Sequence, residues 1–383
     1  MEYVRLKDIG RIITGNTPPT SKPEYYGDYM PFIKATDISL GAKCTLVTEQ
    51  MYSELAAEKY KESLVPKGST CVVTIGSIGK KMTYAHTNLF VNQAINAIIP
   101  KNSYDKEYVY YTIRYSVLPQ LKKLDSGTTT GRENVSKSSF SGIRIPVIKD
   151  KSVQHRIASI LSTYDTLIEN NTKRIRLLEK MAENLYKEWF VRFRFPGYEK
   201  AEMENGLPKG WKVEKLGSLA NISTGKCNRE DAEEEGTFQL FDRSQEIKRS
   251  SKWIKDCEAI IVPGEGTSFV PRYYVGKFNL HQRCYCIEPL IPKIGKFLFY
   301  TIMFYRKYFL SVATGATVPP LRHNNFTYMK ITLPAKEFYT QFDEVVSDLF
   351  AEKDNLQHQN TLLARQRDLL LPRLMSGKLE VKP

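Results

Sequence analysis

Two proline pairs in this sequence resemble part of the site with which enzymes methylate the amino group of adenine. Thr17-Pro18-Pro19-Thr20 and Val318-Pro319-Pro320-Leu321 both contain the two prolines. Neither has the Asn or Asp before them, or the aromatic residue after them, that would hold the base, and no glycine-rich loop for a methyl donor is evident. Turn-forming prolines explain both segments better.

Two further segments resemble a phosphate-binding loop and a nuclease site. Gly76 to Lys81 contains the Gly-Lys pair of a phosphate loop, but Thr74 stands where such a loop needs its first glycine. Lys81 replaces the Ser or Thr that binds magnesium. Glu246 and Lys248 have a spacing found in nucleases, yet no Pro-Asp precedes them to complete a metal site. We therefore expect neither ATP binding nor cleavage by this chain, and interpret Glu246 and Lys248 as a solvated charge pair.

The histidines and cysteines form no recognisable nucleophilic or metal centre. Five histidines are scattered along the chain: His86, His155, His281, His323 and His358. Six cysteines occur without a CxxC pair: Cys44, Cys71, Cys227, Cys257, Cys284 and Cys286. His281, Cys284 and Cys286 match no common zinc spacing. We expect reduced structural cysteines, no metal, no cofactor and no catalytic residue.

Composition favours a globular protein with an anionic partner. The 383 residues are enough for two domains, and 42% of them are hydrophobic. Lys and Arg outnumber Asp and Glu by 56 to 42, a formal net charge of +14. This charge suits a nucleic acid, although an inert basic surface has the same composition. No apolar run reaches the ~20 residues of a membrane span, and Met1 to Gly10 lacks a secretory pattern, so we expect a soluble cytoplasmic protein.

The sequence consists of two copies of one unit. Leu6 to Gly15 is repeated as Leu216 to Gly225, with the Thr-Gly ending conserved between them. Further correspondences follow in the same order: Asn92-Gln93 with His281-Gln282, Tyr111-Thr112-Ile113 with Tyr300-Thr301-Ile302, Ser126-Gly127-Thr128 with Thr314-Gly315-Ala316, and Ile143 to Pro146 with Ile331 to Pro334. A period near half the chain indicates a duplication rather than a solenoid.

Each copy is expected to fold as an α+β domain. Short β-branched and aromatic runs such as Ser69 to Ile75 and Phe90 to Ile99 are separated by Gly, Pro, Asn and Ser. Helical patterns over Asp105 to Leu124 and Ile294 to Val312 interrupt them. This texture predicts a mostly antiparallel or irregular sheet with helices.

A long amphipathic helix is predicted after each copy. Apolar residues spaced by three and four form a stripe: Ile157, Leu161, Tyr164, Ile168, Ile175, Leu178, Ala182, Leu185 and Trp189. In the second copy a heptad series is formed by Phe342, Leu349, Leu356, Leu363 and Leu370, with Val345, Val346 and Leu374 beside it. We predict that the two helices pair as an antiparallel coiled coil. Asn171 and Asn360 interrupt the stripes, either to fix the register or because they lie on its solvated edge.

A linker is predicted between the copies, from Phe195-Pro196-Gly197-Tyr198 to Pro208-Lys209-Gly210-Trp211. The aromatic residues before it, Phe190, Phe193 and Phe195, are interpreted as packing. For Arg192 and Arg194 a phosphate contact and a helix-end role both stay open.

Polar loops at matched places in the two copies are the candidate DNA contacts. Glycine allows close backbone approach, and amides and arginine can read base edges. In the first copy the candidates are Thr14, Gly15, Asn16, Lys80, Lys81, Asn92, Gln93, Thr128, Thr129 and Arg132. In the second copy they are Thr224, Gly225, Lys226, Arg272, His281, Gln282, Arg283, Thr317, Arg322 and His323. Turns alone would also explain the Gly and Thr residues.

The whole layout resembles the specificity subunit of type I restriction-modification systems. Gln154, Ile157-Ala158 and Leu161 open the first helix as in that family, and Pro208 to Trp211 with Leu216-Gly217 opens the second copy. The ending Leu369 to Leu379 is specific to the family. The second copy departs from the pattern because it lacks Ile-Ala after Gln341, which affects where its helix starts.

The resemblance implies a division into target recognition domain 1 (1–150), a central spacer helix (151–195), a linker with target recognition domain 2 (196–336) and a C-terminal spacer helix (337–383). It implies that each recognition domain reads half of a split, asymmetric DNA target. It also implies that the helices set the spacing and dock two modification subunits, while a motor subunit cuts unmodified DNA. The alternatives are a self-contained restriction and methylation enzyme, and a coiled-coil scaffold that binds other proteins.

Overall fold

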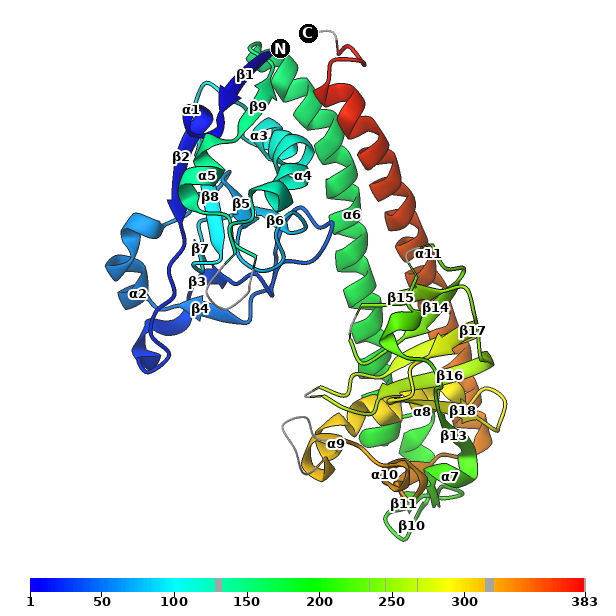
Figure 1. Ribbon diagram of the computed structural model, residues 1–383. Helices are drawn as coiled ribbons and strands as arrows, with labels where there is room; N and C mark the ends of the chain where they lie inside the picture. Colours follow the sequence, from blue (N-terminus) through cyan, green and yellow to red (C-terminus); the bar gives the residue numbers. More distant parts are fainter. Residues whose placement is uncertain (128–132, 234, 245, 267, 314–319, 382–383) are drawn as a thin grey trace. The chain divides into compact units, whose positions relative to one another are not determined.

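The computed structural model describes all residues except 128–132, 234, 245, 267, 314–319 and 382–383 (Figure 1). The chain forms two compact units. Unit 1 contains Met1–Lys173 and Leu356–Pro383, and unit 2 contains Arg174–Asn355. Each unit therefore combines one copy of the sequence repeat with part of each long helix.

Unit 1 contains a four-stranded sheet, a three-stranded sheet and a two-stranded sheet. The strand orders are β2-β8-β5-β6, β4-β3-β7 and β1-β9. Its strands are β1 (Glu2–Arg5), β2 (Gly10–Thr14), β3 (Tyr26–Ile33), β4 (Gln50–Tyr52), β5 (Thr70–Val73), β6 (Met82–Tyr84), β7 (Phe90–Val91), β8 (Ile95–Pro100) and β9 (Arg144–Val147). Its short helices are α1 (Leu6–Ile9), α2 (Glu54–Lys59), α3 (Lys106–Thr112), α4 (Leu118–Leu121) and α5 (Lys137–Gly142).

Unit 2 contains a six-stranded sheet of order β13-β18-β16-β17-β14-β15 and two small sheets, β12-β19 and β10-β11. Its strands are β10 (Met203–Glu204), β11 (Leu207–Pro208), β12 (Lys212–Lys215), β13 (Ala220–Thr224), β14 (Phe238–Phe241), β15 (Lys248–Ser250), β16 (Lys255–Pro263), β17 (Arg272–Leu280), β18 (Cys284–Pro289) and β19 (Lys330–Leu333). Its short helices are α7 (Leu216–Leu219), α8 (Gly295–Phe304), α9 (Arg306–Val312) and α10 (His323–Thr327).

The two copies share their strand pairing, and the α+β prediction is confirmed. The described strand pairs are antiparallel, with two exceptions. β3 pairs with β7 in parallel, with Ile33 beside Val91, and β14 pairs with β17 in parallel, with Phe241 beside Leu280. In unit 2 the continuous strand β17 pairs with both β16 and β14. In unit 1 its place is taken by two short strands, β6 and β7, so one sheet is divided into two.

The long helices are α6 (Lys151–Tyr186) and α11 (Lys336–Met375). Within unit 1, Asp165 contacts Arg367 and Thr172 contacts Asn360. Within unit 2, Arg174 contacts Glu352, and Phe190 packs on Phe342 with ring centroids 5.1 Å apart. Because residue numbers rise along α6 as they fall along α11, the pairing is antiparallel in both units, as predicted.

The predicted apolar stripes cover the paired faces of both helices, with one exception. Ile157, Leu161, Phe342, Val346 and Leu356 are buried, whereas Val345 is 50% exposed. The assignment of Val345 to the stripe was wrong because its neighbour Val346 occupies the inward position of that helical turn.

Side-chain caps explain where several helices begin. Asp105 accepts a hydrogen bond from Tyr108 N (2.9 Å) at the start of α3, and Ser136 accepts one from Ser139 N (3.1 Å) at the start of α5.

Gln154, one of the residues that carried the family resemblance, is fully buried. Its side chain accepts from Asp105 N (2.8 Å) and donates to Ile148 O (2.7 Å), so it fastens α6 to the preceding segment.

The aromatic residues around the linker pack in the core of unit 2, as interpreted from the sequence. Phe190, Phe195 and Trp211 are buried, and the Phe195 ring lies 5.4 Å from that of Trp211. Arg192 and Arg194 both pair with Glu188.

The six cysteines are free thiols. Among the described residues, no helix is long and apolar enough to cross a membrane. The division of the chain at residues 150, 195 and 336 into functional domains stays a prediction.

Candidate nucleic-acid interface

In unit 1 the Thr14-Gly15-Asn16 turn is packed tightly against the loop before β8. Gly15 N donates to Ile95 O (3.1 Å), and Asn16 N donates to Val91 O (2.9 Å). A Cβ atom on Gly15 would lie 2.1 Å from Val91 O. Glycine is therefore required here by backbone packing.

Unit 2 repeats this turn at Thr224-Gly225-Lys226. Gly225 N donates to Cys284 O (3.3 Å), and Lys226 N donates to Leu280 O (3.1 Å). A Cβ atom on Gly225 would lie 1.9 Å from Leu280 O. The two glycines thus have the same structural role, and the next residue, exposed Asn16 or Lys226, differs between the copies.

Polar side chains connect the unit 1 turn with the loop after β5. Thr14 Oγ1 donates to Asn96 Oδ1 (2.6 Å), and Asn96 Nδ2 donates to Thr74 Oγ1 (2.9 Å). Thr17 donates to Gln93. These bonds join three segments that are distant in sequence, around Thr14, Thr74 and Gln93, at one end of the strands β2, β8 and β5.

The remaining candidates of unit 1 differ in their freedom to bind a ligand. Lys80 and Gln93 are exposed, whereas Lys81 Nζ donates to Ala35 O (3.0 Å). Asn92 Oδ1 is buried and accepts no hydrogen bond from a described residue. The side chains best exposed for contact are therefore those of Lys80, Asn16 and Gln93. The Lys81 ammonium is instead held by its hydrogen bond to the backbone.

In unit 2 the corresponding turn is held by His281 and Gln282. Gln282 N donates to Cys227 O (3.0 Å), and its side-chain amide donates to Asn228 Oδ1 (2.7 Å). His281 is 7% exposed, and its Nδ1 accepts from Arg283 N (3.1 Å). Burial, together with the charge of Arg243, lowers the pKa of His281, so a neutral ring that orders the turn is favoured.

Arg283 belongs to an ion-pair cluster, and it is the one member of that cluster that the sequence analysis predicted. Arg283 Nη1 donates to both carboxylate oxygens of Glu265, at 2.6 and 2.8 Å. Arg243 Nη1 donates to Glu265 Oε2 at 2.7 Å. Glu265 and Arg243 were not predicted. Ala94 of the first copy corresponds to Arg283, and Ile75 corresponds to Glu265. An alignment of the copies through these residues would have revealed that uncharged positions of the first copy are charged in the second.

The other basic candidates of unit 2 have varied surroundings. Arg272 is half-buried, its guanidinium donates to Ser244 O, and burial lowers its pKa. His323 Nε2 lies 3.2 Å from Ile222 O and its Nδ1 2.9 Å from Thr327 Oγ1, which fixes α10 beside β13. Arg322 precedes α10 and is exposed. Arg322 and His323 are both exposed, whereas Arg272 is half-buried.

Four predicted contacts, Thr128, Thr129, Arg132 and Thr317, lie outside the described residues. The described residues flanking the first loop are held by Asp125, whose Oδ1 accepts from Asn134 N and Gly127 N, both at 2.8 Å. These bonds lower the pKa of Asp125. In unit 2, Leu321 N donates to Gly264 O (2.7 Å), and the backbone of Pro320 forms an isolated β-bridge with that of Glu265. The described residues that flank the two loops are thus held by hydrogen bonds within their own units.

The two predicted register residues contact the opposite helix. Asn171 is 8% exposed, and its Nδ2 lies 3.4 Å from Gln359 Oε1. Asn360 Nδ2 lies 3.4 Å from Thr172 Oγ1, and Asn360 Oδ1 is buried without a partner among the described residues. In each contact the two residues are 188 positions apart in the sequence. The equivalent residues Ile143 and Ile331 of the two copies have the same separation.

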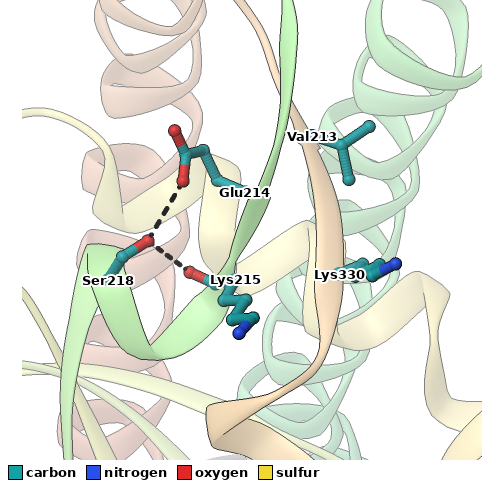
Figure 2. A pocket seen from close by; sticks show the side chains of 5 residues that line it. All are labelled: Val213, Glu214, Lys215, Ser218 and Lys330. Carbon is teal, nitrogen blue, oxygen red and sulfur yellow. Dashed lines mark hydrogen bonds between the residues drawn. The ribbon is translucent and has the colours of Figure 1, made fainter.

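A hollow of about 390 Å³ lies on the β12–β19 sheet of unit 2 (Figure 2). It is lined by Val213, Glu214, Lys215, Ser218 and Lys330. Ser218 Oγ donates to Lys215 O (2.7 Å) and to Glu214 Oε2 (3.4 Å), which ties the side chains to the start of α7 (Figure 2). None of the predicted contact residues lines this hollow.

Comparisons with known proteins agree with the repeat. The family model "Type I restriction modification DNA specificity domain" matches residues 1–180 and 208–362. The MjaIX specificity subunit of a type I restriction enzyme from Methanocaldococcus jannaschii is 27% identical over 416 residues, covering 99% of this chain and 93% of that protein. The EcoDI specificity subunit from Escherichia coli is 32% identical over 177 residues, covering 45% of this chain and 39% of that protein.

The fold also has a solved counterpart. The crystal structure of a type I restriction-modification S subunit from M. genitalium matches with a TM-score of 0.56 and 18% identity, covering 97% of this chain and 95% of that one. This likeness concerns the fold. Because the family model covers most of the sequence in two matched segments, this chain belongs to the type I restriction-modification DNA specificity family.

Proposed function

We propose that this chain is the non-catalytic, DNA-reading subunit of a type I restriction-modification complex, and that each copy of the repeat reads one half of a split target. The observation that carries the proposal is the turn shared by the two copies. Gly15 and Gly225 make equivalent backbone contacts, whereas the residues around them differ in chemistry. Equivalent scaffolds with different side chains suit two readers of different sequences.

The exposed chemistry differs between the units. Unit 1 presents the amides of Asn16 and Gln93 with Lys80. Unit 2 presents Lys226 and Arg322, and Arg283 paired with Glu265. Amides suit the donor and acceptor pair of adenine, and arginine suits the two acceptors of guanine. We infer that the two half-sites differ and that the target is asymmetric.

The proposed partners are double-stranded DNA and modification subunits, two of which would dock on a chain with two copies. Restriction and motor subunits would join in the full complex. The names of the relatives support this assembly, since both are specificity subunits of type I restriction enzymes. In this proposal methylation and ATP-dependent cleavage belong to the other subunits, and the chain works in the cytoplasm.

The paired helices are proposed to set the distance between the half-sites. The buried ion pair of Asp165 with Arg367 and the partly buried contact of Asn171 with Gln359 fix one helix against the other. A rigid pair would keep the spacer length of the target constant. The boundaries at residues 150, 195 and 336 belong to this proposal.

Footprinting of the chain in complex with its modification subunits tests the proposal. We expect two protected sequences of different composition with an unread spacer of constant length. One continuous symmetric site would contradict it. In a second arm, the purified chain alone is incubated with DNA, magnesium and a labelled methyl donor. We expect neither label transfer nor cleavage, and either reaction would favour the self-contained enzyme.

A further inference from the structure

Three charged residues of unit 2 meet beside its candidate contact loops. Arg243 follows β14, Glu265 follows β16, and Arg283 directly precedes β18. The backbone around them is fixed, because Gly264 N donates to Arg283 O (2.8 Å) and the backbone of Glu265 forms an isolated β-bridge with that of Pro320. The cluster is thus held by the central sheet rather than by long free side chains.

The carboxylate lies beneath the two guanidinium groups. The Glu265 side chain is 16% exposed, whereas those of Arg283 and Arg243 are 54% and 44% exposed. Hydrogen bonds from Arg283 and Arg243 hold the pKa of Glu265 below its ordinary range, so it stays ionised at neutral pH. The cluster therefore presents a net positive charge, and its acid group is covered by its own partners.

One edge of Arg283 is left for a ligand. Its Nη1 atom makes both bonds to Glu265, while Nε and Nη2 donate to no acceptor among the described residues. These two atoms carry parallel N–H groups in a planar fork. A fork of this kind matches two neighbouring acceptors, such as O6 and N7 of guanine in the major groove.

The first copy provides an internal comparison. Leu280 pairs with Phe241 as Val91 pairs with Ile33, and Gly264 N donates to Arg283 O as Thr74 N donates to Ala94 O. By this backbone equivalence, Arg243, Glu265 and Arg283 of the second copy correspond to Ala35, Ile75 and Ala94 of the first. All three charged positions are uncharged in the first copy, so the cluster is an addition to the shared scaffold.

We propose that Arg283, oriented by Glu265 and assisted by the neighbouring charge of Arg243, recognises a guanine in the half-site read by the second copy. This inference rests on the proposed function and specifies the chemistry of one of its two readers. Arg283 is the base-contacting residue. Glu265 is a positioning residue, because it acts through the guanidinium that it holds.

Binding assays with the complex of this chain and its modification subunits test the inference. The duplexes carry the mapped target, with each guanine of the second half-site replaced in turn by 7-deazaguanine or by another base. For the unaltered protein we expect one position at which replacement weakens binding by roughly 5- to 150-fold. Arg283→Lys keeps the charge but loses the fork, and should remove most of this discrimination at that position alone.

Glu265→Gln tests the positioning role. The amide can accept a hydrogen bond at only one of its two polar atoms, so Arg283 loses one of its two bonds and its orientation. We expect reduced discrimination at the same base, with unchanged discrimination in the first half-site and an unchanged unfolding temperature. Arg249→Lys is the matched control, because Arg249 is an exposed arginine of the same unit whose guanidinium lies 3.4 Å from Gly236 O and Thr237 O.

The outcomes separate this inference from the proposed function. A second half-site without guanine, or full discrimination by Arg283→Lys, would overturn the inference and leave a split target intact. Full discrimination by Glu265→Gln would overturn the positioning role. A complex that protects no second half-site would contradict the proposed function itself.

Discussion

Arg367 of α11 and Asp165 of α6 form an ion pair whose side chains are 1% and 2% exposed. Tyr111 of α3 donates its hydroxyl to the other oxygen of Asp165. Arg367 also bonds to the neighbouring Asp368 (3.0 Å), which in turn accepts from Arg114 (3.2 Å). Unit 1 thus joins both long helices and its globular part through one polar network, which is buried at Asp165 and Arg367 and exposed at Asp368.

Asp165→Asn should destabilise the protein because the buried Arg367 guanidinium loses its buried anionic partner and keeps only the half-exposed Asp368. Removal of one member of a buried pair costs about 3–5 kcal/mol of unfolding free energy. The measurement is chemical denaturation followed by circular dichroism. As a control, Asp165→Leu combined with Arg367→Met removes both charges and should cost much less. Equal midpoints for Asp165→Asn and the unaltered protein would contradict the prediction.

Gly15→Ala should damage the reading of the first half-site alone. The new methyl group would meet the carbonyl oxygen of Val91 and push the turn away, at a cost of about 1–3 kcal/mol. Discrimination among first half-site variants, measured by binding, should fall while discrimination in the second half-site stays unchanged. Gly142→Ala is the control, since a Cβ there meets nothing within 4 Å. An equal effect of both substitutions would refute the packing argument.

Gly225→Ala is predicted to have the reciprocal effect. Its methyl group would meet the carbonyl oxygen of Leu280, so the second half-site should lose discrimination and the first should keep it. The same binding assay measures this. Loss of discrimination in both half-sites would argue against independent readers.

Asn360→Leu should raise stability, because Asn360 Oδ1 is buried without a partner among the described residues and its Nδ2 makes only a long contact to Thr172. A gain of about 1–2 kcal/mol in unfolding free energy is expected from removing an unsatisfied polar group. Gln366→Leu, at an exposed position of the same helix, should change stability little. A loss of stability in Asn360→Leu would show that the asparagine is better satisfied than its contacts indicate.

Lys226→Met should weaken DNA binding similarly for all sequences. If the exposed ammonium contacts a phosphate, the slope of log affinity against log salt should become shallower by about 0.9. Lys61→Met is the control, since Lys61 pairs with Glu58 in unit 1. An unchanged slope for Lys226→Met, or a change in base preference without a change in slope, would remove Lys226 from the set of phosphate contacts.

The repeat and the long helices were predictable because local sequence patterns specify them. Apolar residues at three and four spacing specify α6 and α11, and the matched Thr-Gly segments specify the turns of both copies. The tight approach of Gly15 to Val91 depends on the pairing of β2 with β8, so sequence reasoning recognised the motif but not the reason for its glycine.

The charged clusters were not predictable from spacing. Arg243, Glu265 and Arg283 are brought together by pairings among β14, β16, β17 and β18, which have no local sequence signal. Arg367 lies on the inward stripe between Leu363 and Leu370, one heptad after Asn360, but no local pattern identifies Asp165 as its partner. Tyr111 and Tyr300 show the same limit, because one donates to Asp165 and the other packs against Phe342.

Exchange of residues 1–150 for the corresponding segment of another family member tests the central claim most directly. The readout is the map of methylated adenines across a genome that carries the chimaeric chain with its modification subunits. The account predicts that the first half-site changes to that of the donor, while the second half-site and the spacer length stay the same. A change in both half-sites, or an unchanged target, would contradict two independent readers on one scaffold.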